Sequence, residues 1–327
     1  MAAPCLLVGD IGGSNARFAL ANAKTPAFSC EKTYQCSDFA SANQVIEAYL
    51  KEVNINKPIA ICIAAAGPIV DGVVRFTNIS WRIETTDLRN EFDTARVRLL
   101  NDFEAIAYSI PWLQKSDVVS VGLPEPKNVK QTDFTVGILG PGTGLGAAGL
   151  CKRGGRISPI VGEAGHLGFA PETQVQIELL SQLRGRFDRV SDERLVSGPG
   201  LENIYWALSK IRGEKNRQLS AAEIFSAASD GGDSAAAEAV HLFFEILGQV
   251  AGNLALSLGA ADGVYIAGGI VKRNPELIAN SRFRAGFERK GRYRSMMENI
   301  PTQVILHPQP GLLGASYCSI ELMNGKW

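Results

Sequence analysis

Apolar and polar residues alternate along the chain in blocks that predict distinct elements. Two apolar runs between residues 4 and 21 flank a Gly-Gly turn, which is the pattern of a β-hairpin. The stretch 37–53 has the character of a helix. The run IAICIAAAGPI at 59–69 is continuous and rich in β-branched residues, as in a fully buried strand. The first third of the chain therefore predicts a hairpin, a helix and a buried strand.

The same order of elements recurs later in the sequence. Residues 134–152 have the pattern strand, glycine turn, strand, and Gly154-Gly155 supports another hairpin turn. A long helical run at 237–260 leads into GVYIAGGIV at 263–271, which predicts a second buried strand. The helical run has one wide apolar face, formed by residues 240, 243, 247, 250, 254 and 258.

This repetition predicts a two-domain α/β protein. Asp10 and Gly140 occupy corresponding places in the two halves, which we interpret as related by a pseudo-two-fold. A chain of 327 residues is also too long for one compact core. We expect residues 1–112 together with 303–327 to form a small α/β domain, and residues 113–302 to form a large one.

Composition and charge narrow the class of protein. Lys+Arg and Asp+Glu each total 33, so no net charge favours nucleic acid or an anionic membrane. No apolar run approaches the ~20 residues that span a bilayer, so we expect no membrane segment. Six scattered cysteines without a CxxC pair predict reduced thiols in a cytosolic protein. Three histidines without metal-ligand spacing argue against a zinc site.

Two glycine-rich turns, one in each half, carry candidate chemistry. GGSN at 12–15 follows the strand that contains Asp10, and GTG at 142–144 follows the first strand predicted within residues 134–152. Glycine turns leave backbone N–H groups unobstructed, as a polyphosphate requires, although both could be ordinary tight hairpins. GxGxxG at 144–149 matches the dinucleotide fingerprint, but we expect a strand where that fingerprint requires a helix. The sequence holds no GxxxxGK[ST] loop and no protein-kinase motif set.

Polar residues in three predicted loops form a second group of candidates. Asn101-Asp102 follow an apolar strand, Glu163 and His166 lie in a glycine-broken loop, and Asp192-Glu193 precede SGPG. Each has a simpler interpretation, in which Asp102 is a helix N-cap, His166 a core histidine and Asp192-Glu193 a solvated turn. Together, an amide, carboxylates and an imidazole suit a hydroxyl-rich ligand, because each sugar hydroxyl both donates and accepts.

Eight motifs, in order along the chain, together resemble those of the bacterial-type glucokinase family. They are GDIGGSNARFAL, LLNDFEAIA, LGPGTGLG, GEAGHLGFAP, ERLVSGPGL, IAGGIV, FRAGFERKGRY and QPGLLGA. That family belongs to the actin/hexokinase-like superfamily of sugar kinases. The resemblance implies a two-domain actin-like, ribonuclease H-like ATPase fold with a cleft between the domains. It also implies a cytoplasmic homodimer that phosphorylates D-glucose at the 6-hydroxyl with ATP, giving glucose 6-phosphate and ADP, the first step of glycolysis.

The resemblance also implies a role for each candidate residue. Asp102 is the catalytic base, and Asp10 holds Mg²⁺ through water. Two departures from the family stand out: Ser14, where Thr is common, keeps the hydroxyl, and Ala164, where Gly is usual, adds a methyl that narrows the loop slightly. Glucose is bound by Asn101, Asp102, Glu163, His166 and Glu193. The nucleotide is bound by Gly9, Asp10, Ile11, Gly12, Gly13, Ser14 and Asn15, by Gly142, Thr143 and Gly144, and by Gly268 and Gly269.

Several alternatives stay open on the sequence. A related hexose or N-acetylhexosamine kinase would share most of these motifs, whereas an acetate- or polyphosphate-handling relative would not need Glu163, His166 and Glu193. A sugar-sensing regulator carries an N-terminal helix-turn-helix, for which we expect no room before a hairpin that begins by residue 5. A repressor-related sugar kinase usually carries a cysteine cluster, and residues 167–190 contain no cysteine.

The basic-aromatic segment RFRAGFERKGRYR at 282–294 has its own alternatives. Taken alone, it resembles an RNA-contacting patch. Zero net charge and the family match favour a helix-turn surface, with contact to the nucleotide as the lesser alternative.

Overall fold

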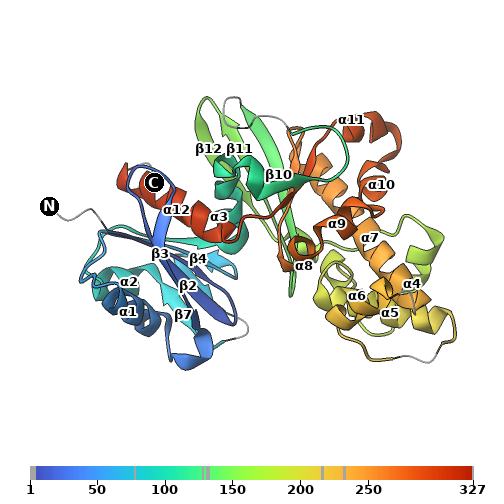
Figure 1. The fold of residues 1–327 in the computed structure, drawn as a ribbon, viewed down its shortest axis with the longest axis horizontal. Helices are drawn as coiled ribbons and strands as arrows, with labels where there is room; N and C mark the ends of the chain where they lie inside the picture. The colour runs from blue at the N-terminus through green and yellow to red at the C-terminus, as the bar shows by residue number, and fades with distance from the viewer. Residues whose placement is uncertain are drawn as a thin grey trace. The chain divides into compact units, whose positions relative to one another are not determined.

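The chain folds into two α/β units, as the repeated pattern predicts (Figure 1). The first unit comprises Met1–Gln114 with His307–Trp327, and the second comprises Lys115–Leu306. The structure is a computed structural model. It describes residues 5–76, 79–126, 129, 133–214, 217–230 and 233–325.

The first unit is built on a five-stranded sheet in the order β3-β2-β1-β4-β8. β1 (Leu6–Ile11), β2 (Asn15–Ala21) and β3 (Phe28–Gln35) are antiparallel, so the predicted hairpin is confirmed. β4 (Ala60–Ala65) and β8 (Val97–Asn101) run parallel to β1. Every residue of β4 is buried, as its continuous apolar run predicts.

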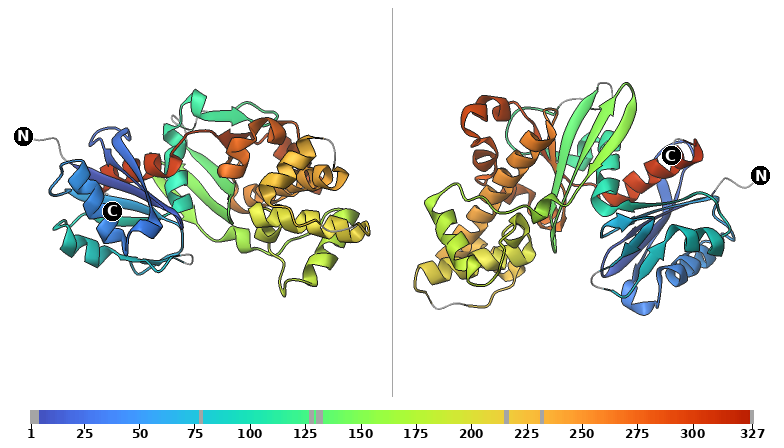
Figure 2. Two further views of the ribbon diagram at one scale, coloured as in Figure 1. Left: turned by 60° about the horizontal axis from the view of Figure 1, so that its bottom comes forward. Right: turned by 180° about the vertical axis from the view of Figure 1, so that it is seen from behind.

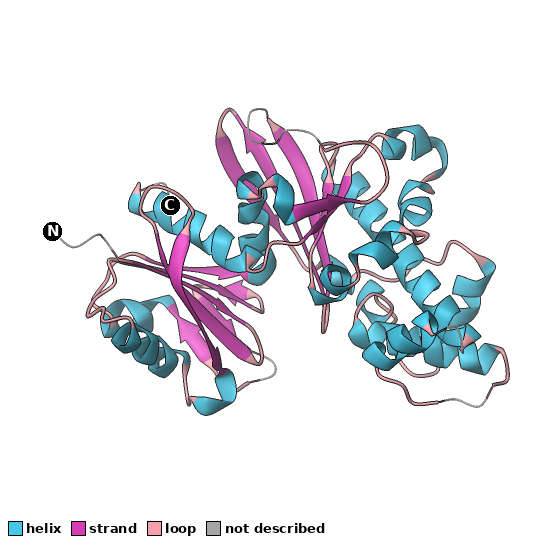
Figure 3. Cartoon of the chain, viewed as in Figure 1, coloured by secondary structure: helices cyan, strands magenta, loops and turns pink. Residues whose placement is uncertain are grey.

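Helices lie on both sides of this sheet (Figures 1 and 3). α1 (Ala42–Glu52) packs on the face that carries Leu7, Ile11 and Phe18, and α12 (Pro310–Met323) packs on β1, β4 and α3 (Asp102–Ser109). α1 starts later than the predicted residue 37, because Ser41 caps it by accepting a hydrogen bond from the N–H of Gln44. The unit is completed by α2 (Thr85–Glu91) and a small sheet of β5 (Ile69–Val70), β6 (Val73–Arg75) and β7 (Arg82–Glu84).

The second unit repeats this sheet topology. Its strand order is β12-β11-β10-β13-β14-β9, and the first five strands match β3-β2-β1-β4-β8 in order and direction. Asp10 and Gly140 are each the next-to-last residue of the equivalent strands β1 and β10, as the repeat predicts. The strands are β9 (Val118–Ser120), β10 (Phe134–Pro141), β11 (Leu145–Arg153), β12 (Arg156–Val161), β13 (Val264–Ile266) and β14 (Thr302–Ile305).

The long helix α7 (Ser234–Leu258) is the centre of the second unit, where it packs on α5, α6, α10 and β10 (Figure 2). It is long and apolar enough to cross a membrane, so the expectation that no run reaches that length was wrong. Of its most apolar window, 83% is buried inside the unit, which identifies α7 as a core helix.

The other helices are α4 (Gln174–Arg184), α5 (Gly198–Ile211), α6 (Ala221–Ser229), α8 (Gly269–Arg273), α9 (Pro275–Ala279), α10 (Phe283–Glu288) and α11 (Arg294–Glu298).

Three further details differ from the sequence-based expectations. The strand predicted at 263–271 ends at Ile266, because Gly268 has a φ of 95° and turns the chain into α8. The chain returns to the first unit after residue 306 rather than 302, because β14 pairs with β13. The first unit also extends to residue 114 rather than 112.

Two sequence patterns have a purely structural explanation. Gly146 and Gly149 lie in strand β11, so the GxGxxG match has no following helix and is not a dinucleotide fingerprint, as expected. The basic segment 282–294 forms α10, a 3-10 turn and α11, which is the helix-turn surface that we favoured. Five of its six cations pair with carboxylates within the unit: Arg282 and Arg289 with Glu245, Lys290 with Glu172, Arg284 with Glu288, and Arg294 with Glu298.

We predict that Gly248→Ala destabilises the protein, although Ala is ordinarily the better helix former by up to ~1 kcal/mol. A Cβ on Gly248 of α7 would overlap the carbonyl oxygen of Phe283 at the start of α10. Overpacking of this kind typically costs about 1–3 kcal/mol, so the urea midpoint and Tm should fall. The matched control is Gly162→Ala, where a Cβ meets nothing within 4 Å and should change stability by about 0.5 kcal/mol or less. Equal stability of the two variants would contradict the close packing of α7 on α10.

Candidate functional site

The candidate residues of the first unit gather at one edge of its sheet. Ile11 of β1 lies beside Ala65 of β4, which lies beside Asn101 of β8. The first glycine turn and the Asn101-Asp102 pair therefore leave the sheet at the carboxyl ends of parallel strands. This is the edge at which open α/β sheets bind ligands. The strand spacing places the turn and the pair about 10 Å apart.

The first glycine turn is held from outside by the end of β3. Inside the turn, the N–H of Gly12 donates to the carbonyl of Asn15 at 2.9 Å. The N–H of Cys36 donates to the carbonyl of Ser14, and the side-chain amide of Gln35 donates to the side-chain oxygen Oδ1 of Asn15. Within the described part of the chain, the N–H groups of Gly13 and Ser14 have no protein acceptor. The turn is thus fixed in shape while two donors stay available.

Asp10 lies at the base of this turn with one cationic neighbour, Arg17, which faces it across the hairpin. The Arg17 Nη1 to Asp10 Oδ2 distance is 3.9 Å, and the Asp10 side chain is 23% exposed. Burial raises the pKa of Asp10, and Arg17 acts in the opposite direction. A Cβ on Gly311 of α12 would lie 3.0 Å from Oδ2, so the start of α12 closes over the carboxylate. Arg17 was not among the predicted residues, although the hairpin pattern pairs it with Asp10.

Gly9 and Ile11, both predicted to bind nucleotide, have side-chain positions that face the core. Ile11 is fully buried, and a Cβ on Gly9 would lie 2.9 Å from the ring of Phe18. The prediction for these two residues can therefore concern only their backbone. Close packing on the Phe18 ring explains why residue 9 has no side chain.

The start of α3 determines the placement of Asn101 and Asp102. Asn101 is the N-cap: its Oδ1 accepts hydrogen bonds from the N–H groups of Phe103 and Glu104, and Glu104 completes a capping box. The Asn101 amide also donates to the carbonyl of Gly67 at 3.3 Å. The simpler interpretation of Asp102 as the N-cap is therefore wrong. Asp102 is the first residue of the helix, where the helix dipole favours a carboxylate.

The second glycine turn, in the second unit, is held by the segment that contains Glu193. The N–H of Gly142 donates to the carbonyl of Gly144, and the carbonyl of Gly142 accepts from the N–H of Gly198, both at 2.8 Å. The N–H of Leu145 donates to Glu193 Oε2 at 2.9 Å. A Cβ on Gly144 would lie 2.5 Å from the same oxygen, whereas a Cβ on Gly142 meets nothing within 4 Å. Glu193, which is predicted to bind sugar, thus contacts the turn that is predicted to bind phosphate.

Glu163 directly precedes the 3-10 turn Ala164–His166, and His166 ends it. Both side chains are exposed. The interpretation of His166 as a core histidine is therefore wrong. A Cβ on Gly165 would overlap the carbonyl oxygen of Leu145, so this position requires glycine. The methyl of Ala164 packs against the hydrophobic core of the unit, so the close approach lies at Gly165 and not at Ala164.

The pair Asp192-Glu193 opens the 3-10 turn Asp192–Arg194 and is not a solvated turn, because Asp192 is only 6% exposed. Its N–H donates to the carbonyl of Leu167, and Arg189 donates to the carbonyl of His166. These bonds join the Glu163/His166 loop to the segment of Glu193. Burial raises the pKa of Asp192 to about 7, although Arg189 and Lys290 act in the opposite direction.

Gly268 lies at the base of the second glycine turn. The N–H of Ala267 donates to the carbonyl of Leu139, and a Cβ on Gly268 would overlap the carbonyl oxygen of Pro141. This packing and its positive φ require glycine at 268. The structure therefore brings Gly268-Gly269 next to Gly142–Gly144, within one unit.

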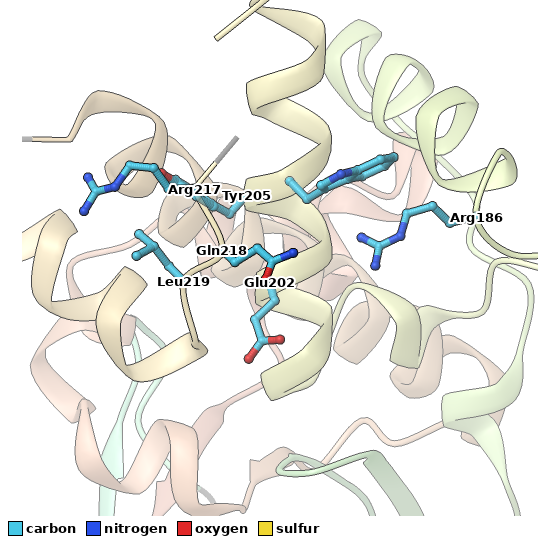
Figure 4. A pocket seen from close by; sticks show the side chains of 7 residues that line it. Arg186, Glu202, Tyr205, Arg217, Gln218 and Leu219 are labelled. Atoms are coloured by element: carbon cyan, nitrogen blue, oxygen red, sulfur yellow. The ribbon is translucent and has the colours of Figure 1, made fainter. Parts of the chain in front are cut away.

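A pocket of about 390 Å³ in the second unit contains none of the predicted site residues (Figure 4). Its three charged side chains are already engaged: Arg186 lies 4.5 Å from the ring centroid of Trp206, Arg217 pairs with Asp233, and Glu202 accepts a hydrogen bond from the N–H of Ala221. We therefore do not take this pocket as the functional site.

Comparison with known proteins covers nearly the whole chain. The Glucokinase family model matches residues 7–321. The glucokinase of Caulobacter sp. (strain K31) is 41% identical over 312 residues, which are 95% of this chain and 93% of that protein. The glucokinase of Cronobacter sakazakii (strain ATCC BAA-894) is 40% identical over 309 residues, 94% and 95% of the two chains. The crystal structure of a glucokinase from an Antarctic psychrotroph is similar with a TM-score of 0.88 at 32% identity, covering 98% of this chain and 99% of that one.

We predict that Asp192→Asn flattens the pH dependence of stability. Because the pKa of Asp192 is raised from 3.8 to about 7, the folded state binds more protons than the unfolded state in this window. The free energy of unfolding therefore falls as the pH rises through it. The variant should lose less stability than the wild type between about pH 5 and pH 8, by on the order of 1–3 kcal/mol.

Urea denaturation at the two pH values measures this difference. The control is Asp188→Asn, which changes an exposed carboxylate four residues away and should leave the pH dependence as in the wild type. Parallel curves for wild type and Asp192→Asn would show that Asp192 does not titrate in this window.

Proposed function

Because this chain belongs to the glucokinase family, we propose that the protein transfers the γ-phosphoryl group of ATP to the 6-hydroxyl of D-glucose, giving glucose 6-phosphate and ADP. This reaction is the first step of glycolysis. The observation that carries the proposal is the match to the family over residues 7–321, supported by 41% identity along 95% of the chain.

Asp102 is the proposed catalytic base. It accepts the proton of the sugar 6-hydroxyl as that oxygen attacks the γ-phosphorus in line and the bond to the ADP oxygen breaks. Its support is its position as the first residue of α3, directly after the N-cap Asn101 and inside the Asn101/Glu104 capping box that fixes the start of the helix. Asn101 supplies that cap, and the proposed sugar contact of Asn101 falls to its amide N–H, because its carbonyl oxygen is already engaged.

Glu163, His166 and Glu193 are proposed to read the other sugar hydroxyls. Glu163 and His166 are exposed on a loop that is held by several backbone hydrogen bonds, and Glu193 is half-buried. A rigid loop with directional donors and acceptors discriminates between hydroxyl configurations, because a wrong sugar leaves polar groups unpaired.

The two glycine turns are proposed to bind the phosphates. The N–H groups of Gly13 and Ser14 are available as donors in the first turn, and Thr143 is exposed in the second. Gly268-Gly269, beside the second turn, are proposed to lie along the adenosine. These assignments rest on the geometry of each turn and on the family motifs.

Asp10 fits the proposed Mg²⁺ position. Its carboxylate has one cationic neighbour, Arg17, at 3.9 Å, which offsets its negative charge only in part. In the described ranges no three His, Cys, Asp or Glu side chains could together hold a metal. One carboxylate acting through water suits Mg²⁺, which in kinases is held mainly by substrate phosphates and water. When bound, Mg²⁺ neutralises charge on the phosphoryl oxygens.

Location and assembly follow as further proposals. We propose that the enzyme acts in the cytoplasm as a homodimer, without nucleic-acid or membrane partners. The six cysteines are all free thiols, which suits a reducing compartment. The pairing of the basic segment with carboxylates supports the absence of a nucleic-acid partner.

We predict that kcat/KM is highest for D-glucose within a hexose panel, measured with Mg-ATP in a coupled ADP-release assay. Galactose, 2-deoxyglucose and N-acetylglucosamine should be poorer by different factors, up to ~10⁴-fold, since each alters a hydroxyl that the loop reads. A preference for N-acetylglucosamine or N-acetylmannosamine would instead support the alternative, an N-acetylhexosamine kinase. Equal rates for all sugars would contradict the assignment of Glu163, His166 and Glu193.

We predict that Asp102→Asn lowers kcat by ~10²–10⁴-fold while glucose binds within about tenfold of the wild-type affinity. Asn is nearly isosteric with Asp but cannot accept the proton. Because Asn101 is the N-cap, the helix start is kept in the variant. Steady-state kinetics and calorimetric glucose titration measure the two quantities.

A matched control for this variant is Asp87→Asn. It removes a carboxylate from the first turn of α2, a comparable place in a helix, and should keep wild-type kcat. A folded Asp102→Asn enzyme with more than about a tenth of the wild-type kcat would contradict the role of Asp102 as base.

A further inference from the structure

Leu145 is the residue at which the sugar-reading segments meet the phosphate turn. It directly follows the second glycine turn and pairs with Pro141 to close the hairpin. Its N–H donates to Glu193 Oε2, and its carbonyl lies against Gly165 in the loop of Glu163 and His166. One backbone unit therefore contacts both loops that carry the proposed sugar ligands of the second unit.

The segment from Glu193 to Gly198 holds the turn at both of its ends. Glu193 binds Leu145 after the turn, and the N–H of Gly198 binds the carbonyl of Gly142 at its start. Between them, the Ser197 hydroxyl donates to the Glu193 carbonyl at 2.8 Å, while its oxygen caps α5. The segment is thus internally braced, so a displacement of Glu193 also displaces the support of the turn.

The Glu193 carboxylate has capacity for a second partner. Oε2 is occupied by the Leu145 N–H, and within the described ranges no protein donor reaches Oε1 of this half-buried side chain, which can accept a ligand hydroxyl. A carboxylate accepts hydrogen bonds at both oxygens, and each bond orders the same side chain. A sugar on Oε1 therefore restrains the group that holds the phosphate turn.

We propose that Glu193 is a positioning residue that couples sugar binding to the shape of the second phosphate turn, acting through its hydrogen bond to the N–H of Leu145. The proposal rests on the proposed function. Occupancy of the sugar site fixes Glu193, which fixes Leu145 and the remaining N–H donors of the turn, those of Thr143 and Gly144, for the nucleotide. Coupling between two sites is reciprocal, so the nucleotide must raise the affinity for the sugar by the same factor.

Two single-methyl variants within the same turn test this link. In Gly144→Ala the new Cβ would lie 2.5 Å from Glu193 Oε2 and must displace it, whereas in Gly142→Ala the new Cβ meets no protein atom. Glucose is titrated calorimetrically into each protein without nucleotide and with saturating Mg-AMPPNP. Circular dichroism and Tm establish that each variant is folded.

We expect nucleotide-free Gly144→Ala to bind glucose about tenfold or more weakly than the wild type, and Gly142→Ala to bind it as the wild type does. A turn that served phosphates alone would not change glucose affinity without nucleotide. The wild type should gain glucose affinity with Mg-AMPPNP, by a factor on the order of 5–150, and Gly144→Ala should lose most of that gain.

A second experiment measures the reverse effect, on nucleotide binding, by comparing Glu193→Ala with His166→Ala. Both should weaken glucose binding, but only Glu193→Ala should weaken Mg-AMPPNP binding in the absence of sugar. If the wild type phosphorylates glucose yet Gly144→Ala and Gly142→Ala bind glucose equally, the link through Glu193 is overturned and the proposed function stands. If the wild type neither binds nor phosphorylates any hexose, the proposed function itself fails.

Discussion

A backbone N–H that a glycine turn uses to hold its own shape is not available to a ligand. This constraint shapes both turns in the structure. The first is held by Cys36 and Gln35 at the end of β3, and the second by Glu193 and Gly198. In each turn one N–H closes the turn internally, from Gly12 to Asn15 and from Gly142 to Gly144, and the other bracing groups come from a different segment, so the remaining N–H groups are fixed without being consumed. The sheets place each turn at the end of an antiparallel pair of strands, and the surrounding loops complete it.

The second turn differs from the first in the nature of its support. A charged side chain, Glu193, takes the place that side-chain amide and backbone groups have in the first unit. A carboxylate makes a stronger hydrogen bond to a backbone N–H than a neutral group does, and its second oxygen can accept another donor. The repeated topology thus supports two turns that are alike in backbone and unlike in chemistry. The second turn is connected through Leu145 to Glu193, one of the residues predicted to bind sugar.

Burial separates carboxylates that look alike in the sequence. Asp102 begins a helix at a sheet edge, Asp10 lies half-buried opposite Arg17, and Asp192 is enclosed next to Arg189 and Lys290. The pKa of Asp192 is raised because its enclosure removes more hydration than the two cations restore. In the basic segment 282–294, five of the six cations are paired with carboxylates.

The secondary-structure elements could be predicted from the amino-acid sequence, because strand and helix patterns and glycine turns are local properties. The hairpins, the buried strand β4, the core helix α7 and the repeat that gives Asp10 and Gly140 equivalent positions in their strands all follow from periodicity. The motifs also indicated the family. The partners of each side chain were decided by tertiary structure, because they come from segments distant in the chain. A Cβ at Gly165 would overlap the carbonyl oxygen of Leu145, and Glu193 accepts a hydrogen bond from Leu145, 48 residues before it, at the end of the second glycine turn. No local pattern encodes such contacts, since they depend on how strands, turns and loops pack in three dimensions.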